Sequence, residues 1–145
     1  VEADDPPGPE GLRRRASLEA REEAGCAVPA ERFAPLGEPL FASPGTSDEK
    51  VFYCAGPAAL DAREAAPGDG SVMEEHGRAV VRELGEAIEA CRRGGIPDMK
   101  TEVALLRLAD HLGYLPQLGL FVDELPEALR ARYRALGAGP ERRGA

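Results

Sequence analysis

The segment from Pro9 to Gly25 constrains the fold more than any other part of the sequence, because it predicts a helix with two unlike faces. Proline suits the first helical turn, and glycine suits the position just after the last one. One side of the helical wheel collects small residues: Ala16, Ser17, Ala20 and Ala24. A face of small side chains permits close approach of a helix to its neighbour, so we expect this helix to pack on a sheet.

Another side of the same helix is acidic at its C-terminal end, where it carries Glu19, Glu22 and Glu23. Like charges three and four residues apart repel by about 0.2–0.5 kcal/mol per pair, and anions near a helix C-terminus oppose the macrodipole by about 0.3–1 kcal/mol each. The total, about 1–2 kcal/mol, opposes folding. Departures from a local rule tend to mark functional or strained positions, so this acidic end is a candidate site.

The rest of the chain predicts a mixed order of strands and helices. Segments 32–43 and 49–56 favour two strands, which the turn cluster at 44–48 would join as a hairpin. Residues 57–76 predict a loop, residues 78–84 a short strand, and residues 114–126 an irregular apolar segment. We expect one helix over 86–93 and another over 127–136. A third helix should begin at Pro97-Asp98, and its apolar surface should cover a sheet. This order indicates an α/β layer fold.

Composition narrows the function classes. The 145 residues, 43% of them hydrophobic and 30% charged, suit a globular chain, and the net charge of −8 argues against non-specific binding to nucleic acid or anionic membrane. No apolar run approaches the roughly 20 residues of a membrane span, and the acidic start lacks the features of a signal peptide. The three cysteines, Cys26, Cys54 and Cys91, form no CxxC motif and are interpreted as reduced thiols used in packing, which favours a cytoplasmic location.

The acidic helix end resembles a known family. "LEAREEAGC" is similar to the helical half of the Nudix box, GX5EX7REUXEEXGU, where U is a bulky aliphatic residue. The carboxylates Glu19, Glu22 and Glu23 match its glutamates and Gly25 its glycine, but Leu18 stands where the family has arginine. Two upstream alignments stay open: an insertion in "PPGPE" with Asp5 as the upstream acid, which we favour, or normal spacing with Glu10 as that acid.

Three further segments occur in the order typical of ADP-ribose pyrophosphatases. "ASPGTSDEKVFYCAG" resembles their SPGXXXE segment, "VMEEHGRAVV" their acidic loop and following strand, and "GGIPDMKTEVALLRL" a late helix start. The resemblance thus implies that residues 1–113 are the C-terminal portion of a Nudix hydrolase domain and that residues 114–145 are a C-terminal extension with a short amphipathic helix. It also implies that the N-terminal strands precede Val1, so that this chain alone would be inactive.

The resemblance implies an α/β/α sandwich with a mixed sheet and Mg²⁺-dependent hydrolysis of a nucleoside diphosphate linked to another moiety. The closest substrate class is ADP-ribose or a related nucleotide sugar, giving AMP and a sugar phosphate, with Mn²⁺ as a possible replacement for Mg²⁺. Glu19 and Glu23 would hold one ion, and Glu22 would share a second. The partners implied are this small-molecule substrate and a second copy of the chain in a homodimer, with no nucleic acid and no membrane.

Other site residues follow from the same resemblance. A general base must reach the attacking water, and Glu74 and Glu75, with His76 behind them, are the candidates. Ser43, Gly45, Thr46 and Glu49 would lie on the substrate side, with an ordinary hairpin turn as the alternative. Lys100 and Thr101 are interpreted as part of a helix cap, and His111 as structural.

Leu18 leaves two interpretations open. Arg15 precedes Glu19 by four residues, so its guanidinium could reach that carboxylate and orient it in place of the missing arginine. An exposed arginine in solvent is the alternative. If nothing replaces the arginine, the chain is a Nudix-like module that binds ADP-ribose or a nucleotide without cleaving it.

Overall fold

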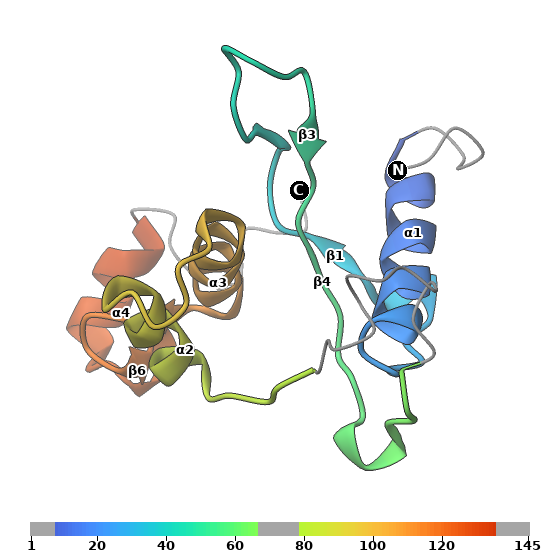
Figure 1. Cartoon of the computed structure of the whole chain (residues 1–145). Helices are drawn as coiled ribbons and strands as arrows, with labels where there is room; N and C mark the ends of the chain where they lie inside the picture. The colour runs from blue at the N-terminus through green and yellow to red at the C-terminus, as the bar shows by residue number, and fades with distance from the viewer. Residues whose placement is uncertain (1–7, 67–78, 136–145) are drawn as a thin grey trace. The chain divides into compact units, whose positions relative to one another are not determined.

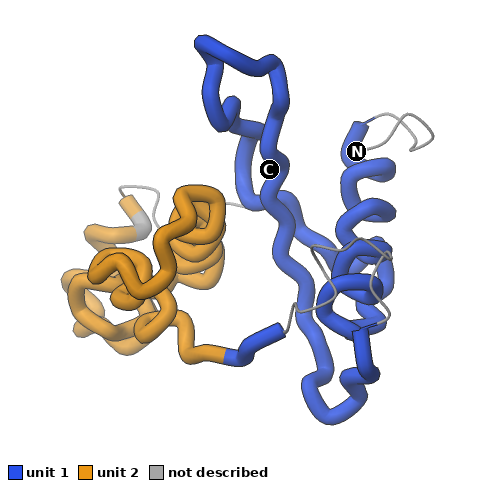
Figure 2. The backbone as a smooth tube through the Cα atoms, in the orientation of Figure 1, with its two compact units in different colours: residues 1–81 blue, residues 82–145 orange. Residues whose placement is uncertain are grey.

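The computed structural model describes residues 8–66 and 79–135, and the chain divides into two compact units, residues 1–81 and 82–145 (Figure 2). The elements of unit 1 are α1 (Pro9–Glu22), η1 (Ala30–Arg32), β1 (Ala34–Pro35), β2 (Leu40–Phe41), β3 (Lys50–Val51), β4 (Cys54–Ala55) and η2 (Leu60–Ala62). Those of unit 2 are α2 (Leu84–Arg92), α3 (Met99–Leu112), β5 (Tyr114–Leu115), β6 (Leu120–Phe121), η3 (Val122–Glu124) and α4 (Glu127–Ala135). In these ranges no helix is both long and apolar enough to cross a membrane.

Helix α1 ends as its sequence predicts. Gly25 has φ +64, a left-handed conformation that glycine adopts without strain, and its amide donates to the carbonyl of Arg21 at 3.1 Å. The Cys26 amide donates to the carbonyl of Ala20 at 2.9 Å. These bonds satisfy carbonyls at the C-terminal end of the helix and turn the chain away from its axis.

The small-residue face of α1 packs mainly on the segment that follows the helix, rather than across a sheet as expected. Ala16, Ala20 and Ala24 lie against a buried cluster of Cys26, Val28 and Phe33, to which β4 contributes Cys54. The Ser17 hydroxyl donates to the carbonyl of Val28 at 2.6 Å, which fixes the returning chain along the helix. Because alanine side chains are short, α1 lies close to the residues on which it packs.

The expected hairpin is present, with an irregularity in its first strand (Figure 1). Strand β1 pairs antiparallel with β4, and β2 pairs antiparallel with β3, in the registers Pro35↔Cys54 and Leu40↔Val51. Residues 36–39 therefore lie opposite residues 52–53, so the first strand bulges by two residues. Gly37, at φ +88, and Pro39 lie in this bulge, where strand pairing is interrupted.

Unit 2 contains the helices expected from the sequence. The helix predicted over 86–93 is α2, which begins two residues earlier, and α3 begins where Asp98 accepts hydrogen bonds from the amides of Lys100 and Thr101. The interpretation of these residues as a cap is thus confirmed. The core of this unit consists of Ala87, Ile88, Cys91, Ala109, Val122 and Leu125.

Several expectations differ from the structure. The helices and small antiparallel sheets are of the general α/β class, but the described ranges hold three two-stranded sheets and no mixed sheet. The strand predicted over 78–84 is wrong, since residues 79–83 have no regular structure and Val80 and Val81 are exposed. A strand needs a ladder partner, and none of the described residues pairs with these.

Unit 2 also differs in its details. The apolar surface of α3 contacts α2 rather than a broad sheet. The segment expected to be irregular contains the β5–β6 hairpin, which packs the rings of Tyr114 and Phe121 with centroids 5.1 Å apart. The division between the two compact units falls after Val81, within the range 1–113 that the resemblance implies for the Nudix portion.

Candidate functional site

The acidic end of α1 presents its carboxylates on consecutive turns. Glu19 and Glu22 lie within the helix, and Glu23 follows as its C-cap with φ −89 and ψ −33, still in the right-handed helical region. The Glu23 amide donates to the Glu19 carbonyl at 2.8 Å, so the helical path continues through this residue. Glu19 and Glu23 therefore leave the backbone from one side of the helix, one turn apart.

Arg15 contacts this acidic end. Its Nη1 atom lies 3.4 Å from Oε1 of Glu19, in the i, i+4 relation that the sequence suggested. The Arg15 side chain is only 17% exposed, whereas that of Glu19 is 44% exposed. The guanidinium thus lies largely against the protein, while the carboxylate that it contacts remains accessible to a ligand.

Leu18, at the position of the family's arginine, is 38% exposed. A large apolar side chain on this outer surface neither buries itself nor offers a hydrogen bond to a carboxylate. Arg15 is therefore the arginine of α1 that the structure places beside the acidic end through a side-chain contact with Glu19.

The turn after α1 is held by a segment distant in sequence. Arg63 donates from Nε to the carbonyl of Ala24 at 2.8 Å, and the Glu64 amide donates to the carbonyl of Gly25 at 3.0 Å. A Cβ added to Gly25 would overlap the carbonyl of Glu64, so the glycine is needed for this close approach as well as for its φ. Sequence reasoning missed Arg63, and its distance along the chain left no local signal.

The predicted substrate-side residues form the tip of the hairpin. Ser43 and Thr46 close the turn, with the Thr46 amide donating to the Ser43 carbonyl at 3.0 Å and their hydroxyls hydrogen-bonded to one another. A Cβ added at Gly45 would meet no atom within 4 Å, and Glu49 is exposed. This tip projects beyond the N-terminal end of α1, whereas the glutamates lie at the opposite end of the helix (Figure 1). The structure does not bring the two sets together.

The remaining predicted residues bear on metal binding. Glu74, Glu75 and His76, and the upstream acid candidate Asp5, lie outside the described residues. Across residues 8–66 and 79–135 no three or more His, Cys, Asp or Glu side chains are grouped as metal ligands. The chemistry of the donors at the α1 end nevertheless suits Mg²⁺, which prefers carboxylate oxygens.

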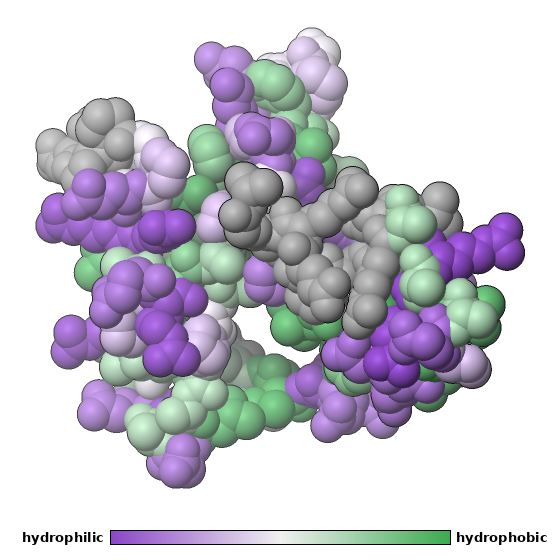
Figure 3. Space-filling view, turned by 180° about the vertical axis from the view of Figure 1, so that it is seen from behind, coloured by the Kyte–Doolittle hydropathy of each residue, from purple (hydrophilic) through white to green (hydrophobic). Residues whose placement is uncertain are grey.

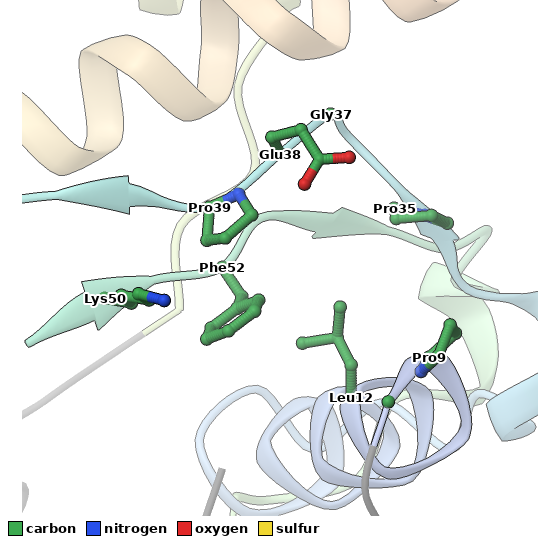
Figure 4. Close-up of a pocket in the computed structure, with 9 residues that line it drawn as sticks. Pro9, Leu12, Pro35, Gly37, Glu38, Pro39, Lys50 and Phe52 are labelled. Atoms are coloured by element: carbon green, nitrogen blue, oxygen red, sulfur yellow. The ribbon is translucent and has the colours of Figure 1, made fainter.

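A groove that the sequence did not predict lies between the N-terminal half of α1 and the bulged strand (Figure 4). It has a volume of about 630 Å³, and Leu12 and Phe52 face one another across it. Glu38 and Lys50 place opposite charges at its rim. Phe52 and the neighbouring Phe41 are exposed on the projecting hairpin, whose surface mixes apolar and hydrophilic residues (Figure 3).

The cysteines are free thiols, with Cys26 and Cys91 buried. Burial raises the pKa of the Cys54 thiol, against a smaller opposing effect of the Arg13 charge. A raised pKa favours the neutral thiol, which is the weaker nucleophile and the weaker metal ligand. The interpretation of these residues as packing groups agrees with this environment.

Comparison with known proteins gives no relative from which a function could be transferred: no family model matches the chain, and neither a curated protein nor a solved structure matches it significantly.

Proposed function

We propose that the protein is a Nudix-type hydrolase that splits the diphosphate of ADP-ribose or a related nucleotide sugar into AMP and a sugar phosphate. The observation that carries this proposal is the acidic end of α1, where Glu19 and Glu23 leave one side of the helix and Arg15 contacts Glu19. The small-residue face that packs α1 on the hairpin and the Gly25 turn that ends it support the same proposal.

Glu19, Glu22 and Glu23 would hold Mg²⁺, or Mn²⁺ in its place. A bound divalent cation neutralises charge on the phosphoryl oxygens while water attacks phosphorus. Arg15 orients the Glu19 carboxylate, because a guanidinium restricts the rotamers of the group that it contacts. Glu74 or Glu75 would take the proton of the attacking water.

A non-catalytic module that binds ADP-ribose or a nucleotide is the second candidate. The observation that favours it is Leu18, whose side chain is exposed on the acidic helix and has no group that could bond a glutamate. In this alternative the helix end keeps its charge but does not orient it for chemistry.

The two functions are separated by incubating the purified full-length protein with ADP-ribose and a phosphatase that acts only on the phosphomonoester products. A hydrolase releases phosphate with Mg²⁺ and releases none with excess EDTA. A binding module gives heat on titration with ADP-ribose and no phosphate under either condition. Neither heat nor phosphate, across a panel of nucleoside diphosphate derivatives, would contradict both candidates.

A further inference from the structure

Arg63 joins three parts of unit 1 that are far apart in the sequence. Its Nε donates to the carbonyl of Ala24 at 2.8 Å, across 39 positions, and its Nη1 donates to the carbonyl of Ala79 at 3.4 Å. The next residue, Glu64, donates its amide to the carbonyl of Gly25 at 3.0 Å. One side chain and one amide thus hold the two residues that directly follow Glu23.

The bond to Ala24 has a specific physical consequence. The last carbonyls of a helix lack intrahelical donors and carry the negative end of the macrodipole. A guanidinium there both donates a hydrogen bond to a carbonyl and is attracted by the dipole. The same helix end also carries Glu19, Glu22 and Glu23, and like charges three and four residues apart on a helix repel. Because these bonds of Arg63 go to backbone carbonyls, they hold the helix end without occupying a carboxylate.

We propose that Arg63 is a positioning residue for the acidic end of α1: by fixing the Ala24 carbonyl it prevents the last helical turn from unwinding and so keeps Glu22 and Glu23 on a formed helical turn, from which the proposed function has them bind a divalent cation. The inference rests on the proposed function for the identity of the ligand. It rests on the contacts of Arg63 alone for the effect on the backbone.

Positioning and simple electrostatics make opposite predictions for Arg63→Ala. Removing a nearby positive charge by itself strengthens the binding of Mg²⁺, because one repulsion is lost. Losing a positioning contact weakens it, and partners of ligands typically contribute about 10–100-fold in affinity. Arg21 provides the matched control, because it is an exposed arginine in the last turn of α1 and does not hold the Ala24 carbonyl, which Arg63 binds.

The test measures two properties of the wild type, Arg63→Ala and Arg21→Ala. The first is hydrogen exchange at the amides of Gly25 and Cys26, which close the end of α1. We expect exchange at least about tenfold faster in Arg63→Ala and unchanged in Arg21→Ala, since only the former opens the turn. Unchanged exchange in Arg63→Ala would overturn the inference whatever the protein binds.

The second property is the affinity for Mg²⁺ alone, measured by calorimetry. We expect about 10–100-fold weaker binding in Arg63→Ala and equal or tighter binding in Arg21→Ala, with partial recovery in Arg63→Lys. Tighter binding in Arg63→Ala would show that the residue acts only through its charge and would overturn the positioning role. A wild type that binds no Mg²⁺ while exchange responds as expected would instead refute the proposed metal function.

Discussion

Nη1 of Arg15 lies 3.4 Å from Oε1 of Glu19, one helical turn away on α1. The pair is partly exposed, and pairs of this kind at i, i+4 contribute only about 0.3–0.5 kcal/mol to stability. Under the proposed function we therefore expect this pair to matter for the orientation of Glu19 more than for stability. An arginine in this place can limit the directions in which Glu19 points, whereas the Leu18 side chain has no group that could bond a carboxylate.

Replacing Arg15 with alanine in the full-length enzyme should raise the Mg²⁺ concentration needed for half-maximal hydrolysis several-fold while changing the melting temperature little. Adding Leu18→Arg to that variant should restore the lower requirement, because a second guanidinium then reaches the glutamates. Arg14→Ala is the control, because Arg14 is an exposed neighbour of Arg15 and its replacement removes the same charge. The measurement is a Mg²⁺ titration of turnover.

A different result identifies the alternative function. If Arg15→Ala has no effect and Leu18→Arg alone creates activity in an inactive wild type, the natural chain is a binding module. Equal effects of Arg14→Ala and Arg15→Ala would show that only the overall charge of α1 matters.

Gly25→Ala should destabilise the protein by at least about 2 kcal/mol, because a left-handed conformation costs an L-residue about 1–2 kcal/mol and the new Cβ would overlap the Glu64 carbonyl. Gly45→Ala is the matched control for stability, since no atom lies within 4 Å of its added Cβ. Urea unfolding measures both. Similar losses in the two variants would mean that neither the left-handed conformation of Gly25 nor its contact with the distant segment is present in solution.

Local rules predicted the ends of helices but not what lies beyond them. Gly25 and Asp98 were recognised from the sequence because a left-handed turn and an N-cap depend on residues a few positions away. The Arg15–Glu19 contact followed from the same kind of spacing.

Contacts between distant segments left no such signal. The bond from Arg63 to Ala24 spans 39 positions, and the bulge opposite residues 52–53 depends on how two strands pair. Residues 79–83 have strand-forming valines but no ladder partner in the described part of the chain, so β-propensity alone gave a wrong prediction there. The Phe52 groove was not predicted for the same reason, since its walls come from a helix and a hairpin.

The Asp98 cap predicts how the stability of the protein depends on pH. Hydrogen bonds from the Thr101 hydroxyl and amide, and then from the Lys100 amide, hold the pKa of Asp98 below its ordinary value. A pKa lowered in the folded state means that the cap contributes its stability above the unfolded-state pKa of about 3.9 and loses it as the pH falls through the lower folded-state value.

Asp98→Ala should therefore lower the melting temperature by a few degrees at pH 7, and its difference from the wild type should shrink below about pH 4. Asp98→Asn keeps a side-chain acceptor without the charge, so it should retain much of the cap and lose this pH dependence. Thermal melts from about pH 2 to pH 7 compare the three proteins. A constant difference between wild type and Asp98→Ala over that range would contradict the cap's ionic character.

Glu23→Gln tests the acidic end of α1 most directly, because it removes one charge and almost no volume. In the full-length enzyme at saturating Mg²⁺ it should lower kcat by orders of magnitude, since an amide is a poor ligand for Mg²⁺ compared with a carboxylate. Without metal it should be more stable than the wild type by about 0.5 kcal/mol, because a repulsion with Glu19 and an unfavourable interaction with the helix dipole are both reduced. Glu31→Gln, at an exposed glutamate of η1 outside the helix end, should change neither quantity. A loss of activity together with a gain in metal-free stability is expected of a carboxylate whose charge is unfavourable until it binds a cation. Unchanged turnover in Glu23→Gln would show that the three glutamates are only a solvated surface.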